Sequence, residues 1–120
     1  MTLSIRNQLP GTVTAVHPGE VMATVKIRLD GGQELTAAIT LESVEHLALT
    51  PGSAVRALLK ATEVSLATGR VDGLSIRNQL PGTLTGLTAV ITKEAATDLG
   101  LFVGSDVVAL IKSTEVSLAV

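Results

Sequence analysis

The chain repeats itself, and this duplication constrains its fold more than any other feature. The ten residues from Leu3 to Thr12, Leu-Ser-Ile-Arg-Asn-Gln-Leu-Pro-Gly-Thr, recur without change from Leu74 to Thr83. A second block, from Ala57 to Ala67, recurs with two substitutions from Ala109 to Ala119. Duplication over this length indicates two copies of one structural unit.

The two copies differ in length. The first block recurs after 71 residues and the second after 52, so 19 residues are missing from the second copy. The loss falls between Thr83 and Leu87, where the first copy has the segment from Val13 to Glu34. Because this segment holds a whole strand, we expect residues 80–92 to fuse into one long strand that is exchanged with a neighbouring chain.

Alternating apolar and polar residues predict the strands. The segment from Val21 to Leu29 has apolar residues at its odd-numbered positions, typical of a half-buried antiparallel strand, and Asp30-Gly31-Gly32 predicts a hairpin turn after it. In the strand over residues 8–16, Pro10 and Gly11 suggest an edge strand or a bulge. Further strands are expected at residues 34–40, 53–60, 64–67, 106–112 and 116–120.

Two short helices complete the pattern. Thr40 is an expected N-cap, with Glu42 in the first turn of a helix that ends near Leu47. A second helix is expected from Lys93 to Leu99, before a turn at residues 103–104. Five strands and one short helix per repeat predict a mainly β protein with small OB-like β-barrels. The expected domains are a first repeat at residues 1–68, a linker at 69–73 and a shortened second repeat at 74–120.

Composition excludes several kinds of protein. The chain has no cysteine, which excludes disulfides and thiolate metal sites. It has no apolar signal core and no run of 18 apolar residues, so we expect neither secretion nor membrane spanning. Binding of single-stranded nucleic acid needs stacking aromatics and a basic groove, whereas Phe102 is the only aromatic residue and the net charge is −2.

Catalytic and metal sites are equally poorly supported. His17 and His46 are the only histidines, and the second copy keeps neither, so no Ser-His-Asp set can be argued. Glu42 and His46 lie four residues apart on the expected helix, but two ligands do not make a zinc site. We therefore expect neither an enzyme nor a metal centre.

Both repeated blocks carry the same small, polar and cationic residues. One block contains Ser-Ile-Arg-Asn and the other Lys-Ala-Thr or Lys-Ser-Thr. Hydroxyl, amide and charged donors of this kind suit a small anion. Since the chain is weakly acidic overall, it would have to bind an anion with local, preorganised donors and not with a global positive field.

These blocks, together with Leu-Thr-Ala-Ala-Ile-Thr-Leu-Glu-Ser-Val at residues 35–44, resemble the Mop, or molbindin, domain, a TOBE-like family that binds molybdate and tungstate. The chain resembles a tandem di-Mop protein with a shortened second repeat. The resemblance implies a cytoplasmic oxyanion-binding, storage or homeostasis protein. It implies a homo-oligomer, a trimer for tandem members and a hexamer for single-domain members, with oxyanions held between subunits. No helix-turn-helix or phosphate-loop motif is present, so we expect neither the regulator nor the transporter ATPase form.

The resemblance also implies oxyanion ligands at the first strand, the helix start and a strand end of each copy. Ala95 stands where Ser43 does, so the second copy lacks one hydroxyl donor. The implied ligands are Ser4, Arg6, Asn7, Thr40, Ser43, Lys60, Ala61 and Thr62 in the first copy and Ser75, Arg77, Asn78, Thr92, Lys112, Ser113 and Thr114 in the second. The alternative is a structural, self-assembling β-barrel module that has lost anion binding through the deletion, its blocks repeating only because the copies fold alike.

Overall fold

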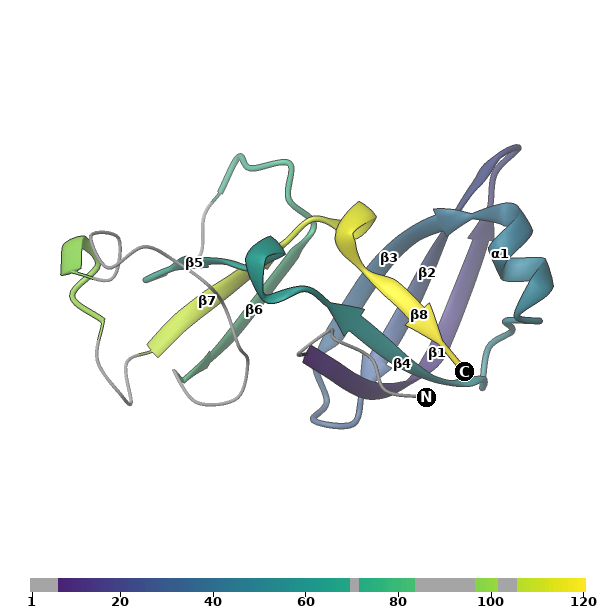
Figure 1. The fold of residues 1–120 in the computed structure, drawn as a ribbon, viewed down its shortest axis with the longest axis horizontal. Helices are drawn as coiled ribbons and strands as arrows, with labels where there is room; N and C mark the ends of the chain where they lie inside the picture. The colour runs from purple at the N-terminus through teal and green to yellow at the C-terminus, as the bar shows by residue number, and fades with distance from the viewer. Residues whose placement is uncertain (1–6, 70–71, 84–96, 102–105) are drawn as a thin grey trace.

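Two antiparallel sheets lie side by side along the long axis of the molecule (Figure 1). The computed structural model describes residues 7–69, 72–83, 97–101 and 106–120. The elements are, in chain order, β1 (Asn7–Pro18), β2 (Met22–Leu29), β3 (Glu34–Thr40), α1 (Leu41–His46), β4 (Ala54–Leu59), the 3-10 turn η1 (Ala61–Glu63), β5 (Ser65–Ala67), β6 (Asn78–Thr83), β7 (Asp106–Ile111), the 3-10 turn η2 (Ser113–Glu115) and β8 (Ser117–Ala119).

The larger sheet has the strand order β3-β2-β1-β4-β8, and the smaller sheet has the order β5-β7-β6. Every pair in both sheets is antiparallel. Since β1 and β3 both run opposite to β2, they run in the same direction as each other, as expected. The mainly β architecture with curled sheets, a short helix and tandem duplication is confirmed.

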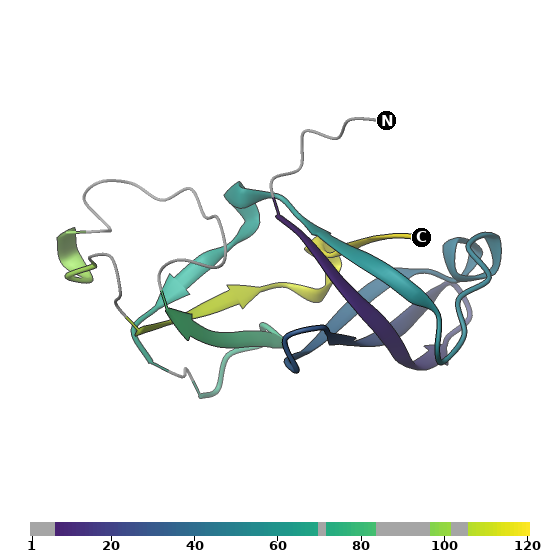
Figure 2. The same ribbon diagram turned by 90° about the horizontal axis from the view of Figure 1, so that it is seen from below.

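The two repeats exchange their last strands. β5 belongs to the first repeat but pairs with β7 of the second, and β8 belongs to the second repeat but pairs with β4 of the first. The chain therefore crosses twice between the sheets, once through η1 and once through η2, near the middle of the molecule (Figures 1 and 2). This exchange within one chain was not predicted from the sequence. The predicted exchange between chains concerns residues 80–92, of which 84–92 lie outside the described residues.

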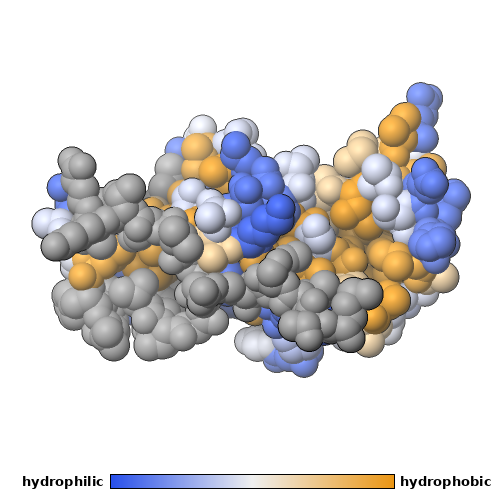
Figure 3. Space-filling model, in the orientation of Figure 1, coloured by the Kyte–Doolittle hydropathy of each residue, from blue (hydrophilic) through white to orange (hydrophobic). Residues whose placement is uncertain are grey.

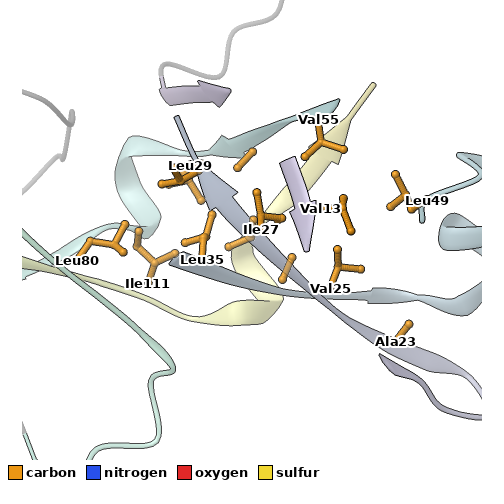
Figure 4. Close-up of a cluster of buried hydrophobic side chains, with 14 of the residues drawn as sticks. Val13, Ala23, Val25, Ile27, Leu29, Leu35, Leu49, Val55, Leu80 and Ile111 are labelled. Carbon is orange, nitrogen blue, oxygen red and sulfur yellow. The ribbon is translucent and has the colours of Figure 1, made fainter. Parts of the chain in front are cut away.

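One hydrophobic core runs through both sheets. Its largest fully buried side chains include Ile27 and Leu59 from the larger sheet and Ile111 from the smaller one. Leu35 of β3 lies beside Ile111 and Leu80, where the two sheets meet (Figure 4). Burial of each such side chain stabilises the fold by about 1.5–3 kcal/mol. Apolar side chains of the two sheets are therefore buried in one cluster where the sheets meet.

Three local predictions need correction. β1 is not an edge strand, because β2 and β4 flank it, but its register shifts between Val13 and Ala15, so the expected bulge lies a few residues further along. Val21 was expected in the buried row but is 72% exposed. It precedes β2 in a turn, where its carbonyl accepts a hydrogen bond from the N–H of Leu41 at 2.7 Å. The period-2 pattern of β2 therefore starts one residue after Val21.

Parts of the predicted second copy cannot be compared with the structure. Residues 93–96 of the second helix and the turn at residues 103–104 lie outside the described ranges. Among the helices that the structure does describe, none is long and apolar enough to cross a bilayer.

Gly11 explains why the Pro-Gly pair is tolerated in a central strand. A Cβ atom at this position would lie 2.7 Å from the carbonyl oxygen of Arg28 and 2.8 Å from a methyl carbon of Ile27. The backbones of β1 and β2 can approach this closely only because residue 11 has no side chain.

We predict that Gly11→Ala lowers the free energy of unfolding by about 1–3 kcal/mol, as overpacking does elsewhere. Gly31→Ala is the matched control, since a Cβ there meets nothing within 4 Å. Chemical denaturation of both variants measures the difference. Equal stability of the two variants would contradict the assigned close approach of β1 and β2.

Candidate functional site

Strand register brings the two repeated blocks together in each copy. In the first copy Asn7 lies opposite Leu59, the residue before Lys60. In the second copy Asn78 lies opposite Ile111, the residue before Lys112. The start of one strand thus meets the end of its neighbour in the same way twice. We call these places the Lys60 corner (Asn7 and residues 60–62) and the Lys112 corner (residues 75–78 and 112–114).

Both corners turn with the same backbone geometry. Lys60 has φ −71° and ψ 135°, and Lys112 has φ −66° and ψ 136°. The N–H of Glu63 donates to the carbonyl of Lys60 at 2.9 Å, and the N–H of Glu115 donates to the carbonyl of Lys112 at 2.9 Å. The first amide N–H groups of such a turn have no partner within it. Each corner therefore combines backbone donors with an adjacent lysine.

The corners lie at the crossovers, on the surface. Lys60, Thr62, Lys112 and Thr114 are exposed. Within the described ranges neither lysine takes part in an ion pair. A hydrophilic patch occupies the middle of one face, near the η1 crossover, with apolar surface on either side of it (Figure 3). Ammonium and hydroxyl groups are thus available to an anion at these places.

The residues that precede the strand in the repeated block are described only at the Lys112 corner. Ser75 and Arg77 are exposed and precede Asn78, and Ser113 is half-buried in η2. In the first copy Ala61 is buried, so it can contribute only its backbone. Ser4, Arg6 and Thr92 lie outside the described residues.

Asn78 is buried, and its amide is engaged with β3. The side-chain oxygen accepts a hydrogen bond from the N–H of Thr36 at 2.7 Å, and the side-chain nitrogen donates to the carbonyl of Thr36 at 2.7 Å. Close by, the side chain of Gln33 donates to the carbonyl of Pro81 at 2.7 Å. Sequence reasoning missed Gln33 and Thr36, because Gln33 lies outside the repeated blocks, Thr36 acts here through its backbone, and only tertiary contact reveals their role.

Thr40 and Ser43 lie at the other end of the larger sheet. Thr40 is the N-cap of α1, as predicted: its hydroxyl oxygen accepts from the N–H of Ser43 at 3.1 Å and its hydroxyl donates to Oγ of Ser43 at 2.7 Å. Thr40 pairs with Met22 at the start of β2, beyond the end of β1 that is remote from Asn7. The path along the 12 residues of β1 is roughly 36 Å at about 3.3 Å per step. Within one chain these hydroxyls therefore do not join the Lys60 corner.

Carboxylates and histidines do not gather into a site. Within the ranges that the structure describes, no group of three or more His, Asp or Glu side chains could hold a metal ion. Glu42 and His46 both lie on α1.

A family model described as "TOBE domain" matches residues 3–66 and 84–118. The molybdenum-pterin-binding protein MopB of Rhodobacter capsulatus is 38% identical over 136 residues, which cover 97% of this chain and 50% of MopB. The molybdenum transport protein ModE of Azotobacter vinelandii is 37% identical over 139 residues, which cover 100% of this chain and 52% of ModE. The chain thus spans about half the length of these curated relatives.

A solved structure is similar over the whole chain. It is the cytoplasmic molybdate-binding protein ModG with molybdate bound, with a TM-score of 0.92 and 40% sequence identity. The match covers 100% of this chain and 99% of that chain. The tandem two-repeat architecture is therefore shared with ModG.

Proposed function

The chain belongs to the TOBE-domain family, with its two repeats of the Mop type, and from this premise we propose that it binds the oxyanions molybdate and tungstate. The observation that carries the proposal is the identical register that joins the repeated blocks at the Lys60 and Lys112 corners. Because the two corners share the same geometry, each would form an anion site with the same kinds of donor.

The donors at each corner suit a tetrahedral dianion. Molybdate offers four acceptor oxygens, and it needs donors that converge from several directions. Lys60 supplies an ammonium group, Thr62 a hydroxyl, and the turn its backbone N–H groups; Lys112, Ser113 and Thr114 offer the equivalent set. Charge-assisted hydrogen bonds from such groups are about twice as strong as neutral ones. A protein of net charge −2 can therefore hold an anion through local contacts.

We propose that the sites are shared between chains. Thr40 and Ser43 resemble family ligands, yet they lie beyond the end of β1 that is remote from Asn7 and the Lys60 corner. A second copy of the chain could bring its own α1 start to a corner. A homo-oligomer, trimeric as the family resemblance suggests, would complete each site and would also cover strand edges.

The proposed role is storage or homeostasis of the oxyanion in the cytoplasm, without catalysis. Support comes from ModG, which is a cytoplasmic molybdate-binding protein, and from the Mop and ModE relatives. The proposed ligands are Lys60, Ala61, Thr62, Lys112, Ser113 and Thr114 at the corners, Ser4, Arg6, Asn7, Ser75 and Arg77 before them, and Thr40, Ser43 and Thr92 at the helix starts.

Titration calorimetry tests this function directly. Purified protein is expected to bind molybdate, and tungstate similarly, well above sulfate at equal ionic strength, because the donors are spaced for a larger tetrahedron. Equal displacement of molybdate by sulfate would leave only a generic anion site. Absence of molybdate binding would favour the structural, self-assembling module instead.

Removal of one corner lysine should weaken binding. Lys60→Ala and Lys112→Ala are each expected to cost about 1.5–3 kcal/mol of molybdate affinity, the range for a hydrogen bond to a charged group. Lys26→Ala is the matched control, because it removes the same charge from an exposed position on β2. If all three variants lose affinity equally, general charge and not corner geometry controls binding.

Sharing between chains can be tested by mixing variants. Ser43→Glu places a repelling carboxylate at the third residue of α1, where glutamate after a threonine N-cap favours the helix. One chain carries this change and the other carries Lys60→Ala with Lys112→Ala. After co-refolding, the mixture is expected to bind more molybdate per chain than the average of the separate variants, because some sites combine two intact halves. Binding equal to that average, or a monomer by light scattering that binds fully, would contradict shared sites.

A further inference from the structure

Asn78 forms a paired polar contact between the two sheets. Its side chain is only 3% exposed, and both ends of its amide bond to the backbone of a single residue, Thr36, at 2.7 Å. An amide that accepts from an N–H and donates to the carbonyl of the same residue reproduces the pair of bonds that a neighbouring strand would make.

Thr36 needs such a partner because β3 is the outer strand of the larger sheet. It lies opposite Lys26 of β2, and its N–H and carbonyl bond to Asn78. Unpaired backbone groups along an edge strand are a liability, and buried ones are costly. The side-chain amide of Asn78 thus satisfies both backbone groups of Thr36 at this edge, as a residue of a neighbouring strand would. No buried side-chain nitrogen or oxygen in the described part of the chain is left without a partner.

Asn78 also belongs to the Lys112 corner. It follows Arg77 and pairs with Ile111, the residue directly before Lys112. The turn η2, which carries Ser113 and Thr114, lies against β3 as well. Both halves of the corner are thus attached to β3, one through Asn78 and one through η2.

We propose that Asn78 is a positioning residue: through its paired hydrogen bonds to Thr36 it holds the Lys112 corner in binding geometry, and it does not itself coordinate the anion. The inference rests on the proposed oxyanion function. The amide side chain is suited to this role because it carries a donor and an acceptor at fixed spacing. A carboxylate lacks the donor, and leucine, of similar size, lacks both groups.

Hydrogen exchange of the Thr36 amide, followed by NMR without ligand, tests the clamp itself. Asn78→Leu is expected to lower protection of this amide about tenfold or more, as the loss of a partner by a buried donor implies. Gln33→Ala removes the exposed Gln33–Pro81 bond of the same interface and is expected to leave Thr36 protected. Unchanged protection in Asn78→Leu would overturn the proposal.

Asn78→Asp separates the paired hydrogen bonds from mere packing. A protonated carboxyl can accept from the Thr36 N–H and donate to its carbonyl, whereas a carboxylate cannot donate. Burial and this bond favour the neutral form, so the pKa of the new carboxyl should rise above the unfolded value of about 3.9. The bond from the Thr36 N–H survives ionisation, because a carboxylate still accepts, whereas the bond to the Thr36 carbonyl is lost. The free energy of unfolding of Asn78→Asp, measured relative to the unaltered protein by chemical denaturation, is therefore expected to be least reduced at low pH and to fall as pH rises through that raised pKa. A pH-independent deficit would contradict the assigned bonds.

Molybdate affinity at pH 7 completes the test. Asn78→Leu is expected to lower it about tenfold, again the scale of one lost polar contact, while Gln33→Ala leaves it unchanged. Weaker binding with unchanged Thr36 exchange would mean that Asn78 contacts the anion, and faster exchange with unchanged binding would mean that the clamp positions nothing; both overturn the proposal. If the unaltered protein binds no molybdate, the proposed function fails, and Thr36 exchange still decides whether the clamp exists.

Discussion

Backbone hydrogen bonds from β8 to β4 and from β5 to β7 tie the two repeats of this chain together. The exchange forces the chain to pass between the sheets twice. Each passage is a sharp turn after a strand, and each turn begins with a lysine, Lys60 in one and Lys112 in the other. The connection that joins the sheets is therefore also the place of the proposed anion donors, so a change in the crossovers would alter both the fold and the proposed site.

The exchange also accounts for how so small a chain is stabilised. A copy of 50 to 70 residues alone is near the lower limit for an independent core. The apolar residues here are almost all aliphatic, and they form one cluster that includes Leu35 from one sheet and Ile111 from the other. Apolar packing does not by itself fix the orientation of the two sheets. The hydrogen bonds between Asn78 and Thr36 at the same boundary are directional, so they restrict how the sheets can lie relative to each other.

Local features of the fold were predictable from the sequence, and the strand exchange was not. The alternation before Leu29 and the N-cap at Thr40 depend on neighbouring residues, and both appear in the structure as expected apart from Val21. The exchanged strands have identical sequences, Val-Ser-Leu-Ala at residues 64–67 and 116–119. Local preference is therefore the same for either sheet, and only the geometry of the turns decides where each strand pairs.

In the candidate site, too, the types of donor were predictable from the sequence, but their arrangement in space was not. The repeated blocks indicated which residues could bind an anion, since donor types can be read from sequence. Their grouping could not be read, because the start of β1 meets the end of β4 only through sheet register. For the same reason the sequence did not distinguish Asn78, whose amide bonds to Thr36, from exposed donors such as Arg77.

The central claim is that oxyanions bind at the two crossovers. The most direct measurement is anomalous X-ray scattering at the molybdenum edge from crystals grown with molybdate. The account predicts molybdenum peaks beside residues 60–62 and 112–114, each completed by the α1 start of another chain. Peaks confined to other surfaces, or none at saturating molybdate, would contradict it.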